Sequence, residues 1–223
     1  MKIRSFAAWL GRVFLIIVLI GNILSTSGKP VSAASSLAPF SNCATQNQVP
    51  IEECDALVSL YNATDGANWS TNNGWLANNT VCMWYGVTCT AGSVSSLDLN
   101  GNQLTGYIPA DLASLIHLKV LDLSWNQLGG GIPSELGSLS NLQKLTLSCN
   151  PLGGTIPTQL ANLSQLSELY LDCDYLTGTI PGELGGLSSL TILDLQTNQL
   201  EGTIPQSWAI CRNCLICTCM ATG

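Results

Sequence analysis

A repeat of 24 residues constrains this chain of 223 residues more strongly than any other feature of its sequence. Leucine, asparagine, glycine, isoleucine and proline recur in phase over five units, and chance does not give five residue types one shared period. One unit cannot bury its own leucines, whereas stacked units share a continuous core. The repeat therefore predicts an α/β solenoid, a right-handed curved stack of five full repeats and a truncated sixth, with a parallel sheet on its concave face. The asparagine slot is filled by Asn102, Asn126, Asn150, Asp174 and Asn198.

Each part of the unit has a structural role. Its paired leucines alternate with polar residues, as in a short strand that has one buried face. The asparagine amide both donates and accepts, so stacked asparagines are expected to form a ladder that satisfies the backbone of neighbouring turns. Asp174 interrupts this column. An ionised carboxylate cannot donate, so we expect the weakest rung there.

The first 33 residues are expected to form a signal peptide. Three basic residues lie within residues 1–12, residues 13–20 are continuously apolar, and residues 31–33 offer the small side chains of a cleavage site. The alternative is an uncleaved signal anchor, but the apolar run is well short of the ~20 residues that a spanning helix needs. The sequence therefore predicts a secreted, extracellular or surface-associated protein without a membrane span after cleavage, and a linker over residues 34–50.

The chain without this leader is strongly acidic. Four of the seven basic residues precede residue 34, which leaves three against all 14 carboxylates. Nucleic-acid binding needs a basic surface, so the charge excludes it. His117 is the only histidine. A histidine-dependent catalytic triad or a multi-histidine metal site therefore has no basis in the sequence.

Two regions together resemble a known family. Residues 94–210 carry the repeat. The preceding region, residues 51–93, contains Trp69, Trp75 and the stretch from Cys82 to Cys89. They resemble the plant-type extracellular leucine-rich-repeat proteins, which include ectodomains of receptor-like kinases, polygalacturonase-inhibiting proteins and secreted bacterial or algal relatives. The resemblance implies an N-terminal cap over 51–93, repeats over 94–219 and a tail over 220–223. It also implies an extracellular binding scaffold with neither catalytic activity nor a cofactor.

The resemblance further implies disulfides in the cap. Cys82 matches the second member of the family's cysteine doublet, whose partner would be Cys89. Val81 replaces the first member, so Cys54 lacks its usual partner and Cys43 is the expected substitute. Ten cysteines in an exported chain favour such bridges. They would fasten the cap over the open end of the solenoid.

Six further cysteines leave alternatives open. Cys149 and Cys173 occupy the same slot of adjacent units, where the sequence is compatible with a bridge or with two free thiols. We interpret the cysteines near the C-terminus as apolar core positions or incidental disulfides of the truncated sixth unit, with Cys217 beside Leu193. A metal site is the minority alternative, because the paired spacing of zinc sites is missing. These four cysteines are Cys211, Cys214, Cys217 and Cys219.

The outward positions of the expected strands supply the candidate binding residues. Side chains between and beside the buried leucines should face solvent on the concave sheet. Acidic residues there favour a basic peptide or a polyhydroxylated sugar, and an aromatic side chain on a rigid surface is a typical contact anchor. The alternative is a solvated polar face without a ligand. The candidates are Asp98, Asp122, Trp125, Lys144, Glu168, Tyr170, Asp172 and Asp194.

Three hypotheses for function follow. The first is a secreted or cell-surface non-catalytic scaffold that recognises a protein, peptide or glycan through its concave or lateral surface. The second is a structural or assembly protein that self-associates through its C-terminal edge, because no polar terminal cap follows Cys219. The third, an inhibitor of a cell-wall-degrading glycosidase, rests on the family resemblance. Carboxylates such as Asp98 and Asp122 lie on adjacent rungs, but without a general-acid context they do not indicate a hydrolase.

Overall fold

The computed structural model describes Phe40, residues 42–203 and the backbone of residues 213–215, all within the compact unit Leu37–Gly223. The expected signal peptide (1–33), the expected tail (220–223) and three of the C-terminal cysteines lie outside the described residues.

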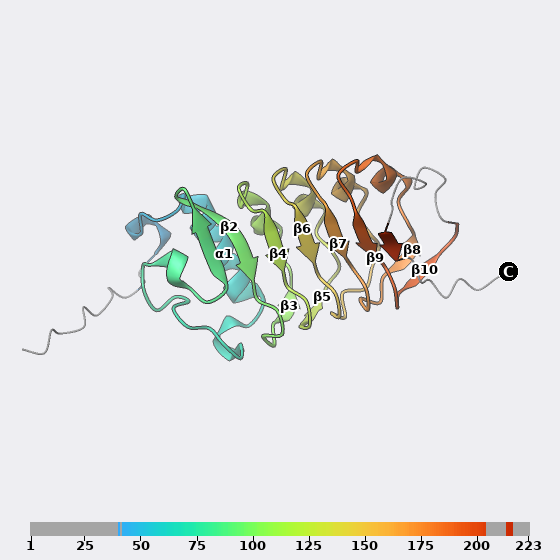
Figure 1. Cartoon of the computed structure of the whole chain (residues 1–223). Helices are drawn as coiled ribbons and strands as arrows, with labels where there is room; N and C mark the ends of the chain where they lie inside the picture. Colours follow the sequence, from blue (N-terminus) through green and yellow to red (C-terminus); the bar gives the residue numbers. More distant parts are fainter. Residues whose placement is uncertain (1–39, 41, 204–212, 216–223) are drawn as a thin grey trace, which may run out of the picture. The chain divides into compact units, whose positions relative to one another are not determined.

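One seven-stranded sheet runs through the described part of the chain (Figure 1). Its first two strands are antiparallel, and each later strand is parallel to its neighbours. The strands lie in chain order, so each coil adds one strand beside the last. They are β1 (Val87–Thr90), β2 (Ser93–Asp98), β4 (Val120–Asp122), β6 (Lys144–Thr146), β7 (Glu168–Tyr170), β9 (Ile192–Asp194) and β11 (Asn213–Leu215).

The strand leucines confirm the predicted register from β2 to β9. Leu97 pairs with Leu121, and the same step continues through Leu145, Leu169 and Leu193. All five side chains are buried. Complete burial of a leucine contributes ~1.5–3 kcal/mol, so this column is a major source of the stability that holds the coils together.

Four coils among the described residues return behind the sheet through a short 3-10 helix that follows a proline. Proline fixes φ near the value that a helix start requires, and it brings no amide hydrogen that the first turn would leave unpaired. A leucine within each helix is buried in the shared core. The helices are η4 (Ala110–Ser114), η5 (Ser134–Ser138), η6 (Thr158–Asn162) and η7 (Gly182–Gly186).

Two short parallel sheets add a feature that the repeat did not predict. β3 (Thr105–Tyr107) pairs with β5 (Gln127–Gly129), and β8 (Thr177–Thr179) pairs with β10 (Gln199–Glu201). A glycine lies within or directly after each of these strands. Glycine weakens a strand signal in the sequence, so the repeat alone did not indicate these strands.

The asparagine column forms the expected ladder. Asn126 Oδ1 accepts hydrogen bonds from the amides of Asn102 and Leu104 in the preceding coil, at 3.0 and 2.9 Å. Its Nδ2 donates to the carbonyls of Leu99 and Leu123, both at 2.9 Å. A ladder side chain therefore closes the turn of the coil before its own. The same kinds of bond are made by Asn150 and Asn198.

Asp174 is the incomplete rung of this ladder. Its Oδ1 accepts from the amide of Asn150 at 2.9 Å, but its buried Oδ2 has no hydrogen-bond partner. Burial raises the pKa of the carboxyl to about 8; the hydrogen bond from Asn150 opposes the shift, and the negative charge of Asp172 adds to it. The side chain is therefore mainly neutral at pH 7, and its weakness as a rung grows as the pH rises.

The last described strand corrects the expected register of the sixth unit. β11 pairs Cys214 with Leu193 (214 − 193 = 21 residues), whereas the 24-residue spacing placed Cys217 there. The connection into this coil is thus three residues shorter than the repeat. Trp208 and Cys211 replace two leucines that mark the other return segments, so the sequence has no strong anchor that would enforce the longer period.

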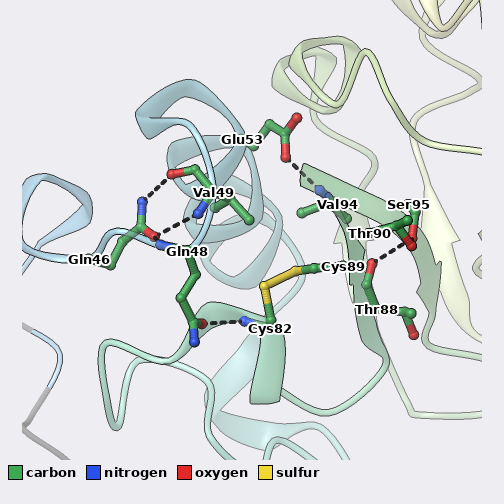
Figure 2. The surroundings of a disulfide bond; sticks show 10 residues. All are labelled: Gln46, Gln48, Val49, Glu53, Cys82, Thr88, Cys89, Thr90, Val94 and Ser95. Atoms are coloured by element: carbon green, nitrogen blue, oxygen red, sulfur yellow. Dashed lines mark hydrogen bonds between the residues drawn. A yellow bond between two sulfur atoms is a disulfide. The ribbon is translucent and has the colours of Figure 1, made fainter. Parts of the chain in front are cut away.

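The N-terminal cap is built around α1 (Ile51–Ala63), which is joined to the first strand of the parallel stack. Glu53 Oε2 accepts a hydrogen bond from the amide of Val94 at 2.7 Å (Figure 2). Short 3-10 turns complete the cap: η1 (Cys43–Thr45), η2 (Gly66–Asn68) and η3 (Val81–Met83). Trp75 lies at the centre of its core, with ring centroids 4.9 Å from Trp69 and 5.0 Å from Trp84.

Both disulfides implied by the family resemblance are present. Cys43 is bonded to Cys54 with a Cα–Cα distance of 5.6 Å, and Cys82 is bonded to Cys89 at 5.5 Å. Figure 2 shows the side chain of Gln48 reaching the second bridge, where it accepts from the amide of Cys82 at 2.9 Å. Residues 43–49, which were expected to belong to the linker, are thus fastened to the cap.

Candidate functional site

The outward side chains of β2, β4, β6, β7 and β9, with the residues that directly follow these strands, form a surface that we call the sheet face. The strand leucines are buried and the residues on either side of them are half-buried or exposed. The alternation is that of strands with one face in the core. All eight candidate residues named from the sequence lie on the sheet face or at its edge.

Lys144, Glu168 and Tyr170 form the central cluster of the sheet face. Lys144 Nζ lies 3.2 Å from Glu168 Oε2 and 5.2 Å from the centroid of the Tyr170 ring. Partial burial lowers the pKa of Lys144, but the hydrogen bond and charge of Glu168 outweigh it and the pKa is raised overall. Burial, followed by the charge of Glu168, raises the pKa of Tyr170. The cluster is therefore a cation held between a carboxylate and an aromatic ring.

Three of the candidate aspartates make the same local hydrogen bond. Each accepts, through Oδ1, from the amide two residues later, at 3.0–3.2 Å. This bond orients the carboxylate at the end of its strand and satisfies a backbone donor. The aspartates are Asp98, Asp122 and Asp194. A fourth, Asp172, accepts instead from the hydroxyl of Ser148 in the preceding coil.

Trp125 is the most exposed aromatic residue at this surface, with 67% of its area accessible. It belongs to a column of residues that follow the strands with positive φ, between 55° and 62°. The amide of Trp125 donates to the carbonyl of Ser148 at 2.8 Å, which fixes the backbone. The indole ring itself is exposed to solvent. The column consists of Gly101, Trp125, Cys149, Cys173 and Thr197.

The structure has Cys149 and Cys173 as free thiols, which is one of the two states that the sequence left open. Both are half-buried. Burial raises the pKa of Cys149 to about 12, and the hydrogen bond to the neighbouring Cys173 thiol and the charges of Asp172 and Asp174 act in the same direction. The pair lies beside Trp125 in the column just described.

Sequence reasoning missed a link between the cap and the first coil. Glu53 is buried, and besides its bond to Val94 its Oε1 lies 3.4 Å from Nδ1 of His117, whose side chain is half-exposed. The contact of His117 is therefore with α1 of the cap and not with the sheet face. No sequence signal pointed to this pair, because the two residues belong to different structural units and are separated by 64 positions.

Comparisons with known proteins agree with this architecture. The family described as leucine rich repeat matches residues 140–200, and single repeats of that description match residues 93–115 and 117–139. A chain of the BIR3–SERK2 complex from Arabidopsis thaliana is 38% identical, over 69% of this chain and 86% of its own, with a TM-score of 0.61. The BIR2 ectodomain from the same plant is 36% identical, over 69% and 84%, with a TM-score of 0.64.

The chain is a plant-type extracellular leucine-rich-repeat protein.

This leucine-rich-repeat protein is also similar to a plant ice-binding protein, with 30% identity over 73% of this chain and 53% of that one and a TM-score of 0.68. A binding scaffold is the general class of function that the ectodomain relatives support. The two disulfides and these relatives also support an extracellular location. In the part of the chain that the structure describes, no helix has the length and apolar character needed to cross a bilayer.

Proposed function

We propose that this leucine-rich-repeat protein is exported by its signal peptide and binds a basic peptide, or a basic segment of a protein, across its sheet face without catalysing a reaction. The observation that carries the proposal is the exposed ring of Trp125 beside a rigid surface rich in carboxylates. Similarity to a chain of the BIR3–SERK2 complex supports a protein as the type of partner.

The charge of the sheet face favours a cationic ligand. Five of the eight candidate residues are carboxylates, and the single lysine among them, Lys144, is already paired with Glu168. A negative surface steers a positively charged partner during encounter. The orientation of Asp98, Asp122 and Asp194 by backbone amides means that binding need not first order these side chains, which lowers the entropic cost of association.

The test is a double variant, Trp125→Ala with Tyr170→Ala, measured against lysine- and arginine-rich peptides with aspartate-rich peptides as the negative probe. Removing both rings should weaken binding of the basic peptides at least ~10-fold, equivalent to about 1.4 kcal/mol. Binding should also weaken as salt is added, because exposed charges are screened beyond ~8 Å at physiological ionic strength. Fluorescence anisotropy measures both effects.

Tyr107→Ala is the matched control, since Tyr107 is a similarly exposed aromatic residue that lies on β3 and outside the sheet face. Its binding should equal that of the unaltered chain. Unchanged affinity in the double variant, or equal affinity for acidic and basic peptides, would reject the sheet face as the binding surface.

Ice is a second candidate ligand. Similarity to a plant ice-binding protein suggests it, and one observation in this structure adds support. Thr155, Thr179 and Thr203 are exposed and fill the same slot of three successive coils. A Cβ on Gly178 would lie 3.1 Å from the methyl group of Thr155, and a Cβ on Gly202 the same distance from that of Thr179, so each of these two threonines lies beside a glycine of the next coil. The threonines recur once per coil, but Thr179 pairs with Glu201 in the sheet of β8 and β10, so Thr203 lies two residues beyond the position opposite Thr179 in this row of hydroxyl and methyl groups.

A thermal-hysteresis measurement tests this second function. Ice binding predicts a gap between freezing and melting points that Thr179→Lys abolishes, because a long charged side chain interrupts the row at its centre. Thr158→Lys, at an exposed threonine on η6, serves as the control and should keep the gap. The absence of any gap in the unaltered chain removes ice as a ligand.

A further inference from the structure

Cys149 and Cys173 are held side by side by bonds on both sides of the pair. One residue before them, the hydroxyl of Ser148 donates to Asp172. One residue after them, the amide of Asn150 donates to Asp174 Oδ1 at 2.9 Å. The two cysteines therefore keep the register of their coils with no freedom to slide past each other.

This geometry suits a covalent bridge. Parallel strands lie ~4.7–4.9 Å apart, and disulfides join residues whose Cα atoms are ~4.4–6.8 Å apart. The amide of Cys149 donates to the carbonyl of Asp172 in the next coil at 2.8 Å, so the backbones remain in hydrogen-bond contact at this point. Both residues also have the same backbone conformation, with φ of 58° and 62°, and their thiols are within hydrogen-bond contact of each other.

We propose that Cys149 and Cys173 form a modification site, a dithiol that a small disulfide such as oxidised glutathione converts into a third disulfide joining two neighbouring coils.

The reaction is two successive thiol–disulfide exchanges. The thiolate of one cysteine attacks the sulfur–sulfur bond of oxidised glutathione, which forms a mixed disulfide and releases one glutathione thiolate. The second cysteine then attacks the protein sulfur of the mixed disulfide, which forms the Cys149–Cys173 bond and releases the second glutathione. Two electrons pass from the protein sulfurs to glutathione, and the two thiol protons are taken up by the departing thiolates.

The surroundings of Cys149 make the exchange with oxidised glutathione slow. Only a thiolate attacks a disulfide, and the raised pKa of Cys149 keeps that thiol protonated at neutral pH. The crosslink would join the two coils whose ladder is incomplete at Asp174. It would therefore reinforce the interface in which the hydrogen bonds of an asparagine are missing.

Peptide mapping of the full chain tests the proposal directly. Cleavage after glutamate separates the two cysteines, because Glu135, Glu168 and Glu183 bound peptides 136–168 and 169–183, each with one cysteine. The four C-terminal cysteines fall in a third peptide, 202–223. The chain is incubated with or without oxidised glutathione, alkylated in denaturant without reduction, digested and weighed by mass spectrometry.

The expected product is a crosslinked pair of peptides, 136–168 with 169–183, that increases on treatment with oxidised glutathione and separates on reduction. Cys149→Ser should leave Cys173 as a stable glutathione adduct instead. The midpoint of thermal unfolding should rise by several degrees in the oxidised chain and not in Cys149→Ser, because closing the loop restricts the unfolded state.

Three results would overturn the proposal. In the first, both cysteines are still free after treatment and become alkylated. In the second, each cysteine keeps its own glutathione adduct. In the third, either cysteine is bonded to peptide 202–223. None of these outcomes depends on a ligand for the sheet face, so the proposed function and the proposed modification site are tested independently.

Discussion

Asp174→Asn is expected to stabilise the folded chain, and to do so most at high pH. In this variant an amide nitrogen that can donate hydrogen bonds would replace the unpaired Oδ2 of Asp174. At the equivalent positions, Nδ2 of Asn150 and Nδ2 of Asn198 each donates to two leucine carbonyls. At pH 8 the free energy of unfolding should increase by several kcal/mol, because the parent chain must then bury a carboxylate without a partner or hold a proton that its unfolded state has lost. Urea unfolding of both proteins across a range of pH measures the difference.

The sign of the pH dependence follows from the raised pKa. The Asp174 carboxyl has a pKa of about 8 in the folded chain against a reference value of 3.8, so between these values the folded state holds a proton that the unfolded state has lost. Stability is then complete below the lower value and falls by up to ~1.4 kcal/mol for each pH unit toward the higher one. In Asp174→Asn this contribution to the slope disappears, and the two proteins should differ by only about 1 kcal/mol near pH 4.

Asp98→Asn is the control, because Asp98 is exposed and lies outside the ladder. Its effect on the free energy of unfolding should stay within about 0.5 kcal/mol at every pH. An Asp174→Asn chain that is no more stable at pH 8 than at pH 4, relative to the parent, would show that the Asp174 carboxyl is not neutral in the folded state.

Gly106→Ala is expected to separate the cap from the first coil. Gly106 lies on β3 with φ of +83°, and an added Cβ would approach the carbonyl oxygen of Ala63, at the end of α1, to 2.2 Å. Backbone atoms cannot yield as a flexible side chain does, so the cap helix or the first coil must shift. We expect a loss of about 4 kcal/mol or more, from the strained φ together with the lost packing.

Gly101→Ala isolates the clash from the backbone strain. Gly101 also has positive φ, +60°, but an added Cβ there meets no atom within 4 Å. Its loss should therefore be only the ~1–2 kcal/mol of a left-handed alanine. Equal losses in the two variants, measured by urea unfolding, would show that Gly106 is required for its conformation alone and not for the contact with α1.

The fold could be predicted as far as the repeat landmarks extend. Leucines in phase placed the strands from Leu97 to Leu193 correctly, because a parallel register follows directly from equal spacing when each strand has one buried face. The same reasoning placed Cys217 beside Leu193, where the structure has Cys214. The spacing of the last two strands depends on how the connecting segment folds, and there the leucines that would report its length are replaced.

The candidate site was predictable by position but not by interaction. Alternation along the strands identifies Lys144, Glu168 and Tyr170 as outward residues, yet their mutual contacts depend on side-chain conformations that a spacing rule does not contain. The link from Glu53 to Val94 and His117 had no signal at all, because it depends on how α1 docks on the first coil. Contacts between unlike units are outside the scope of a repeat.

The direction of the asparagine ladder has a consequence for how the molecule acquires its structure. The turn at Asn102 and Leu104 is closed by Asn126, and the turn at Asp174 and Leu176 by Asn198, so each coil depends on its successor. A polypeptide emerging with its N-terminus first would leave its newest turn unfinished until 24 further residues had followed. Folding would then start at the disulfide-bonded N-terminal cap, and each coil would become ordered only after the next coil had emerged.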